Sequence, residues 1–289
     1  MDNNLFKYGT TSVVLGKTHY KGFFDDREGK ILKVTNILEN HNEFKILEKV
    51  RKIKNYEKYF IIPDEEKIKI LEDSNFVEHL KKLCDGLDVN VFGKNMFCTY
   101  IPYGGSLDVM DSLINYNPYV WKSCKSLLNF SKQIIKALTF LHENQIAHLD
   151  IKPENIIIDL STLTFKLVDF GFSSSYPFDD FVDNIRGTPS YFPRDFGSDK
   201  FLPPIKANDT TITIKGLSPI KYNRNYVYKI DTFCFGRVLL LVYMNYKINT
   251  KRFFEYKNKR KVKKLLKCLL EEDVKQRLLP NQILYLHLN

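Results

Sequence analysis

The stretch Ile146–Phe172 reads IAHLDIKPENIIIDLSTLTFKLVDFGF. It places Asp150, Asn155 and Asp169 at fixed offsets, with Lys152 beside the first of them. The intervening run IIIDLSTLTFKLV alternates well enough to predict a short hairpin, which would bring the three side chains together. Two carboxylates and an amide suit a hard cation bound through oxygen, and one carboxylate is left to meet a substrate hydroxyl. The stretch therefore predicts Mg²⁺-assisted phosphoryl transfer.

The overall composition is that of a folded chain. Among its 289 residues, 44% are hydrophobic and 27% are charged, which excludes disordered, collagen-like and small disulfide-rich classes. The N-terminal MDNNLFKYGT lacks the basic and apolar regions of a signal peptide. The longest apolar run, Val238–Met244, is far short of the roughly 20 residues that span a bilayer. We therefore expect a soluble protein that does not insert into a membrane.

The cysteines favour a reducing, cytoplasmic setting. They are odd in number and scattered, without the close pairs of a disulfide framework or a zinc site: Cys84, Cys98, Cys124, Cys234 and Cys268. The net charge of +10 fits an acidic substrate, nucleic acid or a membrane surface. It equally fits an AT-rich genome, because only three alanines accompany many Lys, Asn, Ile, Tyr and Phe residues.

The N-terminal region, residues 5–34, predicts a small antiparallel sheet from the runs LFKYG, SVVLGK and KILKV. The turn KYGTTSVV places Gly9 and small hydroxyl residues before a strand, where backbone N–H groups can approach phosphate. A single glycine between strands is also an ordinary hairpin. Alternation in the third strand puts Ile31 and Lys33 on one face and Leu32 and Val34 on the other.

A helix is predicted next, in NHNEFKILEKVRKI, because its apolar residues recur at helical intervals. Asn40 or Asn42 is the expected N-cap, which puts Glu43 in the first turn. A lysine on a strand and a glutamate on the following helix are usually two solvated charges. A functional role for Lys33 and Glu43 is indicated only if both side chains face the same cleft.

Further helices and strands follow along the chain. We expect a helix at Phe76–Cys84, a strand in NMFCTYIPYGGSL that ends in a hinge-like turn, and a mostly buried helix in SLLNFSKQIIKALTFLHEN. After Phe172 come a Ser- and Asp-rich loop and GTPSYFPRD. Residues 196–229 are long for a connection and indicate a functional loop or an insertion. KIDTFCFGRVLLLVYM and RKVKKLLKCLLEED predict an apolar and an amphipathic helix.

At this point the chain resembles the eukaryotic-type protein kinase family over essentially its whole length. HLDIKPEN is similar to the catalytic loop of that family, and DFG occurs intact at 169–171. The resemblance implies that Asp150 orients the substrate hydroxyl or accepts its proton. It implies that Asn155 and Asp169 bind Mg²⁺ and that Lys152 neutralises the transferring phosphoryl group. A lysine two residues after the aspartate is the serine/threonine form.

The resemblance also assigns the nucleotide-binding residues. Lys33 matches the strand lysine that contacts the α- and β-phosphates, and Glu43 matches its helix partner. Lys7 stands in place of the first glycine of the Gly-rich loop. The remaining positions implied for ATP are Gly9 and Ser12 (second and third glycines), Val14 (valine after the loop), Ile31 (beside the adenine), and Thr99 and Ile101 (hinge side).

Three further positions match the end of the activation segment and its supports. Thr188 in GTPSYFPRD is implied to hydrogen-bond near Asp150 and Lys152. Asp195 replaces the usual glutamate that pairs with a buried arginine, and Arg277 stands where that arginine is expected. Asp231 matches the aspartate that braces the catalytic-loop backbone.

Two departures from the family pattern bear on how the enzyme is activated and on which nucleotide it uses. Leu149 replaces the arginine that commonly clamps a phosphorylated activation loop. Our hypothesis is that the enzyme is active without phosphorylation of Ser173, Ser174 or Ser175. Ile31 stands where a small residue usually contacts the base, so GTP remains open as an alternative to ATP.

The sequence thus predicts an α+β, bilobal protein-kinase-like fold in one domain. The N-lobe covers about 1–101, the hinge about 98–105 and the helical C-lobe about 106–289, with an insertion at about 196–229. The predicted activity is transfer of the γ-phosphoryl group of ATP, with Mg²⁺, to Ser or Thr of protein substrates. The alternatives are a pseudokinase that acts as a scaffold and a kinase of small molecules. Nucleic acid is not expected as a partner, because the lysines are dispersed and no stacking-aromatic motif accompanies them.

Overall fold

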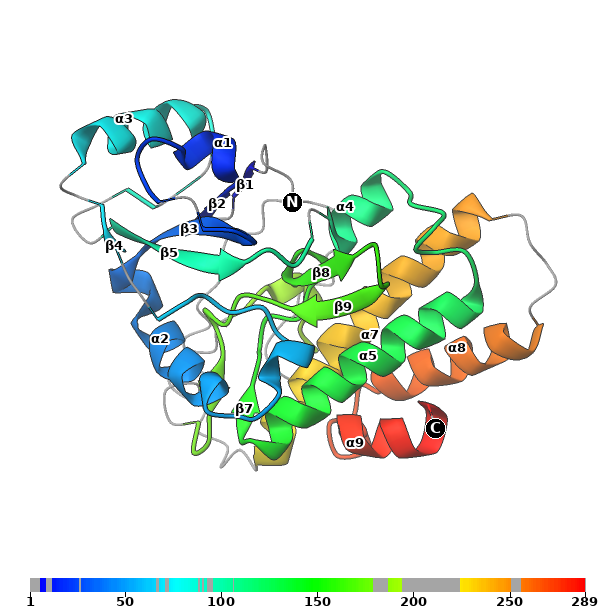
Figure 1. The fold of residues 1–289 in the computed structure, drawn as a ribbon. Helices are drawn as coiled ribbons and strands as arrows, with labels where there is room; N and C mark the ends of the chain where they lie inside the picture. Colours follow the sequence, from blue (N-terminus) through cyan, green and yellow to red (C-terminus); the bar gives the residue numbers. More distant parts are fainter. Residues whose placement is uncertain are drawn as a thin grey trace.

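The protein is represented by a computed structural model, which describes residues 6–8, 12–25, 27–65, 68–70, 73–87, 89, 91–92, 96–105, 107–178, 187–193, 224–250 and 256–288. An antiparallel sheet with helices around it forms the upper lobe, and a mainly helical part forms the lower lobe (Figure 1). This mixed α+β architecture confirms the predicted fold class.

A five-stranded sheet forms the centre of the upper lobe. Its strands, in spatial order, are β1 (Phe6–Tyr8), β2 (Ser12–Leu15), β3 (Lys30–Asn36), β5 (Met96–Pro102) and β4 (Ile68–Lys69). Its helices are α1 (Lys17–Tyr20), α2 (Ile37–Arg51) and α3 (Ser74–Leu83). The three β-prone runs of residues 5–34 and the helix near Phe76 are therefore confirmed.

Strand register separates the two faces of this sheet. Leu32 and Val34 are fully buried and belong to the core that α1 and α3 complete. Lys33 points to the other face, where its cross-strand partners are Val14 on β2 and Thr99 on β5. The alternation predicted for β3 is thus confirmed. It turns Lys33 towards the lower lobe.

The start of α2 differs from the prediction. The helix begins at Ile37, immediately after the last residue of β3, so Asn40 and Asn42 lie within it and the expectation that one of them is the N-cap was wrong. No loop separates strand from helix, and Asn36, the last residue of β3, stands directly before the first helical residue. Glu43 consequently lies in the second turn and not in the first.

Helices dominate the lower lobe. They are α4 (Val109–Ile114), α5 (Cys124–Glu143), α7 (Arg224–Asn249), α8 (Tyr256–Leu269) and α9 (Pro280–Ile283), and a single π-helical turn follows at Leu284–Leu288. The Ser123 side chain caps α5 by accepting a hydrogen bond from the N–H of Ser126, 3.1 Å away. The apolar residues that predicted this helix pack against α7 and α8. The two other predicted C-lobe helices are confirmed as α7 and α8.

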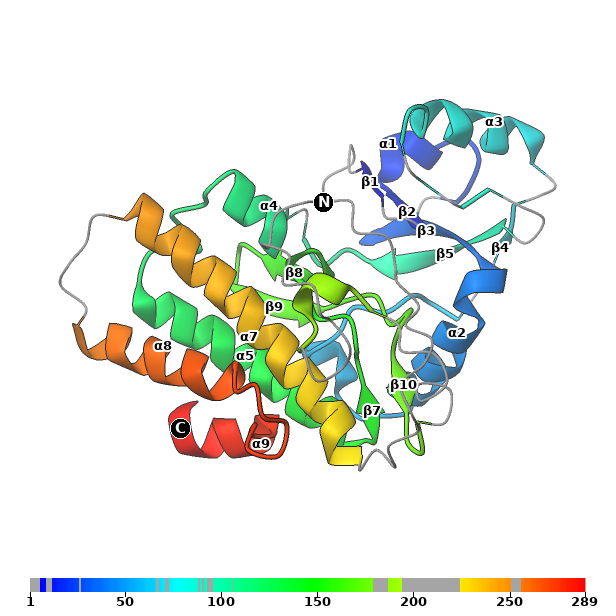
Figure 2. The same ribbon diagram turned by 180° about the vertical axis from the view of Figure 1, so that it is seen from behind.

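Short strands connect these helices to the upper lobe (Figure 2). β6 (Leu107–Asp108), β8 (Ile156–Asp159) and β9 (Thr164–Leu167) form one sheet, and β7 (Ile146–Ala147) pairs with β10 (Ser174–Ser175). Three single turns of 3₁₀-helix lie at Tyr56–Lys58, Pro153–Asn155 and Pro189–Tyr191. β8 and β9 are antiparallel with Ile156 opposite Leu167, which confirms the predicted hairpin.

The proposed insertion at 196–229 ends earlier than expected. Because α7 begins at Arg224, residues 224–229 belong to that helix. The rest of the proposed insertion lies outside the described residues, as do Gly9 and Asp195.

Two properties of the chain bear on its surroundings. Across the described ranges, no helix combines the length and the apolar character that crossing a membrane requires. All five cysteines are free thiols, and four of them are buried.

Candidate active site

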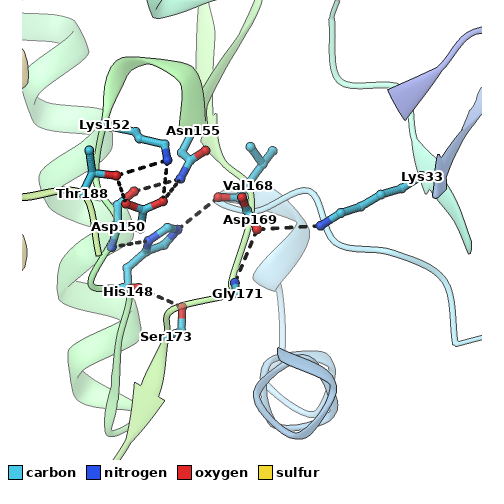
Figure 3. Close-up of polar contacts among 10 residues, drawn as sticks. All are labelled: Lys33, His148, Asp150, Lys152, Asn155, Val168, Asp169, Gly171, Ser173 and Thr188. Atoms are coloured by element: carbon cyan, nitrogen blue, oxygen red, sulfur yellow. Dashed lines mark hydrogen bonds and ion pairs between the residues drawn. The ribbon is translucent and has the colours of Figure 1, made fainter. Parts of the chain in front are cut away.

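The predicted hairpin assembles the three oxygen-bearing side chains (Figure 3). Asp150 lies in the loop after β7, Asn155 ends the 3₁₀ turn before β8, and Asp169 follows β9. The N–H of Val168 donates to the carbonyl of Asn155 at 3.1 Å, which ties the two sides of the hairpin together at its open end. The Asn155 amide donates to Oδ2 of Asp150 at 2.8 Å and to its carbonyl at 2.9 Å.

Asp150 is the centre of a dense polar cluster. Lys152 Nζ lies 2.8 Å from its Oδ2, and the Thr188 hydroxyl donates to its Oδ1 at 2.6 Å. Lys152 Nζ also donates to Thr188 Oγ1 at 3.2 Å. Burial lowers the pKa of Lys152, but the Asp150 carboxylate outweighs burial and raises it, so Lys152 is a cation. These contacts fix the carboxylate of Asp150 in one orientation. The Asp150 side chain is only 2% exposed.

A second ionic cluster joins the two lobes. Lys33 Nζ lies 3.1 Å from Glu43 Oε1 on α2 and 3.7 Å from Asp169 Oδ1 in the lower lobe. Burial lowers the pKa of Lys33, but the two carboxylates outweigh it and the net shift is upward. Burial raises the pKa of Asp169, but the positive charges of Lys33 and Lys152 outweigh burial, so the net shift of this pKa is downward. Lys33 is therefore charged, and its ammonium group points at the Asp169 anion (Figure 3).

The proposed nucleotide-binding positions lie along one face of the upper sheet. Register aligns Lys7, Val14, Lys33 and Thr99 in a row across four strands, and Ile31 is opposite Ile101 in the next row of the same face. The Thr99 hydroxyl is buried and has no hydrogen-bond partner within the described part of the chain. Ser12, at the start of β2, pairs with Thr35.

Lys7 forms a second bridge between the lobes, which the sequence did not predict. Its Nζ contacts the carboxylates of Asp108 and Asp111, at the start of α4. Burial lowers the pKa of Lys7, whereas the two aspartates raise it and prevail. Asp108 also caps α4 by accepting from the Asp111 N–H at 2.8 Å. The position that the resemblance gives to a glycine thus carries a side chain that reaches the lower lobe.

Asp231 braces the loop that carries Asp150. Its Oδ2 accepts the N–H of His148 at 2.9 Å and its Oδ1 accepts the N–H of Leu149 at 2.7 Å. Leu149 has a φ of 64°, a conformation that side-chain-bearing residues rarely adopt. His142 Nε2 lies 2.8 Å from the same Oδ2. A fully buried carboxylate on α7 therefore holds the loop of Asp150 in a strained shape.

His148 is a structural member of the site that sequence reasoning missed. It is fully buried, and its Nε2 lies 3.1 Å from the carbonyl of Val168, so it links the loop of Asp150 to the residue before Asp169. Its own carbonyl accepts the Ser173 hydroxyl at 3.0 Å. The only signal in the sequence was its position two residues before Asp150.

The serines after the DFG segment have distinct environments. Ser173 is fully buried, and Ser174 is buried in β10. The Ser175 hydroxyl accepts a hydrogen bond from Lys49 of α2 at 2.6 Å. Ser173 therefore supports the loop of Asp150, and replacing all three serines together would disturb that support.

Arg277 is fully buried beside α7. It donates to the carbonyls of Glu271, Glu272 and Lys229 at 2.6, 2.9 and 3.4 Å. Its predicted partner, Asp195, lies outside the described residues, so that pairing stays a prediction.

The donor set fits a magnesium ion held together with a polyphosphate. Within the described residues there is no cluster of three or more His, Cys, Asp or Glu side chains that would form an all-protein cage. Asn155 uses its amide N–H₂ on Asp150, which leaves its oxygen available, and Asp169 supplies a carboxylate. Mg²⁺ prefers such a site, with one or two carboxylates and the remaining ligands from phosphate and water.

Comparisons with known proteins agree with this geometry. The family model described as "Protein kinase domain" matches residues 28–287. A stretch of 63 residues is 44% identical to serine/threonine-protein kinase ULK3 of Xenopus laevis and covers 22% of this chain and 14% of that protein. Serine/threonine-protein kinase ppk34 of Schizosaccharomyces pombe is 30% identical over 105 residues, covering 36% and 28%.

A third relative is similar over a comparable stretch. The carbon catabolite-derepressing protein kinase of Candida glabrata is 30% identical over 113 residues, which are 39% of this chain and 17% of that protein. The matches span less than a third of the length of each of these relatives.

Proposed function

The chain belongs to the protein kinase family, and from that premise we propose that it transfers the γ-phosphoryl group of ATP to serine or threonine hydroxyls of proteins. The observation that carries the proposal is the environment of Asp150. Of the roughly four acceptor positions on a carboxylate, Asn155, Lys152 and Thr188 use three. One position on Oδ1 is left for a substrate hydroxyl.

Each residue then has a chemical role. Asp150 orients the incoming hydroxyl and accepts its proton, and Lys152 stabilises negative charge that develops beside it. Lys33, held by Glu43, binds the phosphates from the upper lobe. Asn155 and Asp169 would hold Mg²⁺, which supplies charge neutralisation on the phosphate oxygens when bound. Catalysis in this scheme rests on positioning and electrostatics.

The preference for serine and threonine is supported by two observations. Lys152 and Thr188 lie against Asp150, and the resemblance associates that lysine with serine/threonine kinases. Two of the similar proteins described above are named serine/threonine-protein kinases. We propose ATP as the donor, and because Ile31 stands where a small residue usually contacts the base, GTP is tested beside it.

We further propose that activity does not require phosphorylation after the DFG segment. Leu149 carries no positive charge, and Lys49 already contacts the unmodified Ser175. Phosphatase-treated enzyme and a Ser174→Ala, Ser175→Ala variant should both retain activity. Because Ser173 is buried and bonded to His148, it is left intact in this test. Loss of activity in both samples would overturn this part of the proposal.

The experiment that tests the function is a peptide-array screen with the purified chain, MgCl₂ and labelled ATP or GTP, followed by phosphoamino acid analysis. We expect label on serine and threonine from ATP. Label on tyrosine only, or label on small molecules but on no peptide, would refute the assignment. A chain that binds nucleotide and labels nothing would be a pseudokinase.

A further inference from the structure

Helix α8 carries an unusual concentration of positive charge. Seven of its 14 residues are Lys or Arg and none is acidic, whereas Lys and Arg make up 44 of 289 residues in the whole chain. Lysine-rich composition alone therefore does not account for it. The six whose side chains are described are all exposed: Lys259, Arg260, Lys261, Lys263, Lys264 and Lys267.

The charges form one continuous stripe. At about 100° per residue, Arg260, Lys263, Lys264 and Lys267 fall within an arc of about 100° that extends about 10 Å along the helix. The opposite side of α8 packs into the lower-lobe core through Val262, Leu265, Leu266 and Leu269. The helix is thus anchored on one face and cationic on the other. We call the stripe of Arg260, Lys263, Lys264 and Lys267 the α8 basic face.

The α8 basic face is electrostatically unfavourable without an anion. Lys259 and Lys263, Arg260 and Lys264, and Lys263 and Lys267 are like charges one turn apart, which repel. Cations in the first turns also oppose the helix dipole, and the first turn has no acidic residue. Within the described part of the chain, no ion pair involves any of these cations.

Acidic residues flank α8 in the sequence, Glu255 before it and Glu271, Glu272 and Asp273 after it, and Glu255 lies outside the described residues. Glu271 and Asp273, just after α8, accept backbone N–H groups of Asp273 and Lys275. A row of like charges that forms no ion pair within the described residues is complementary to a polyanion.

We propose that the α8 basic face is a docking surface for an acidic segment of the protein substrate. The proposal rests on the proposed function, which makes the partner a protein. Among the α8 residues whose side chains are described, 258–269, none is aromatic and no large apolar side chain is exposed for insertion into lipid. A peptide segment rich in Asp and Glu can bind the α8 basic face through its negative charge alone, without stacking or apolar contacts.

The position of α8 determines what docking would do. In both views α8 lies at the outer edge of the lower lobe, beyond α5 and on the opposite side of the molecule from α2 (Figures 1 and 2). The Asp150 site lies between them, near β7 and β8. An acidic segment bound at α8 would raise the local concentration of a distant acceptor hydroxyl without touching the reacting groups. Docking should therefore change KM and leave kcat unaltered.

The test uses two substrates that share one acceptor peptide and one flexible linker. One ends in a twelve-residue Glu/Asp segment and the other in a Gln/Asn segment of equal length. The 289-residue chain is compared with an Arg260→Glu, Lys263→Glu, Lys264→Glu, Lys267→Glu variant. A control with the same change in net charge carries Lys52→Glu, Lys54→Glu, Lys58→Glu and Lys81→Glu, all exposed positions elsewhere. Gln replacements at the four α8 positions serve if the reversal variant fails to fold.

At 0.1 M salt we expect the acidic substrate to have a KM at least roughly fivefold below that of the neutral one, with equal kcat. The α8 variant should abolish the difference, and the control variant should keep most of it. Equal KM values for the two substrates in the parent enzyme, or equal losses in both variants, would overturn the proposal.

A binding measurement separates this inference from the proposed function. Fluorescence anisotropy of the labelled acidic segment alone needs no catalysis, so α8-dependent binding by a chain that phosphorylates nothing would support docking and refute the kinase assignment. Duplex DNA and vesicles with 30% phosphatidylserine are measured in parallel, the vesicles because Tyr285 and Leu286 are exposed near Cys268 at the end of α8. Tighter α8-dependent binding to either of these than to the acidic segment would contradict an acidic protein as the partner.

Discussion

The Thr188 hydroxyl donates a hydrogen bond to Asp150 Oδ1 at 2.6 Å, and so connects the segment after the DFG region to the proposed catalytic carboxylate. Thr188→Val keeps the shape and removes this donor. Because a hydrogen bond to a charged group contributes about 2 kcal/mol, we expect kcat to fall roughly thirtyfold. Thr188→Ser should recover most of the loss. Steady-state kinetics on one peptide substrate measure both variants, and an unchanged kcat in Thr188→Val would show that the contact plays no part in turnover.

The brace from Asp231 gives a prediction on stability and activity together. Asp231→Asn replaces one acceptor oxygen by N–H₂, which then faces a backbone donor of His148 or Leu149. We expect a loss of about 3 kcal/mol in unfolding free energy, as for a buried donor left unpaired, and a lower kcat because Leu149 relaxes.

Urea denaturation and kinetics at saturating ATP measure the two effects of Asp231→Asn. The matched control is Asp159→Asn at the end of β8, where the carboxylate accepts its hydrogen bonds from the adjoining turn, and it should change stability by less than about 1 kcal/mol. Similar losses in the two variants would remove any special role for Asp231.

The bridge from Lys7 to Asp108 and Asp111 predicts a contribution to nucleotide affinity. Lys7→Met should raise KM for ATP about threefold with little change in kcat, since a partly exposed ion pair is worth less than about 1 kcal/mol. The effect should shrink at high salt, because the pair is screened. Lys82→Met, which breaks the exposed Lys82–Glu78 pair within α3, is the control and should leave KM unchanged. A KM that does not respond to Lys7→Met would mean that the bridge does not hold the lobes around nucleotide.

His148 predicts how stability depends on pH. Burial lowers its pKa below the ordinary value of 6.5, although Asp231 and Asp150 act in the opposite direction. A base whose pKa is lower in the folded state contributes stability that is complete above about pH 6.5 and is lost as the pH falls through the lowered pKa. Unfolding free energies measured from pH 7.5 to 5.0 should therefore fall towards acid.

The control for this slope is His148→Phe, which cannot titrate. It should be less stable at pH 7.5, since it loses the contact with the Val168 carbonyl, but its stability should fall less between pH 6.5 and 5.0. Parallel curves for the two proteins would assign the acid sensitivity to other groups.

Much of the site was predictable because its determinants are local. The hairpin that joins Asn155 to Asp169 follows from strand alternation within one short stretch. The orientation of Lys33 follows from alternation along β3. In both cases one periodic pattern fixes which side chains share a face, without reference to the rest of the fold.

The rest depends on contacts between residues far apart in sequence. Lys7 meets Asp108 across the two lobes, 101 positions away, and no local pattern pairs them. Ser173 was grouped with Ser174 and Ser175 because the sequence shows only three consecutive serines, whereas in the fold Ser173 is buried and donates to the carbonyl of His148. The start of α2 was misplaced because β3 runs directly into the helix, with no intervening loop residue to mark the boundary in the sequence.

The central claim is that Asp150 performs Mg²⁺-dependent phosphoryl transfer, and one measurement tests it most directly. Incorporation of label from [γ-³²P]ATP into the best array peptide is compared for the parent chain and Asp150→Asn, after circular dichroism has shown that both are folded. We predict Mg²⁺-dependent labelling by the parent and a loss of at least roughly a hundredfold in the variant. Labelling by Asp150→Asn within a few-fold of the parent would contradict the account.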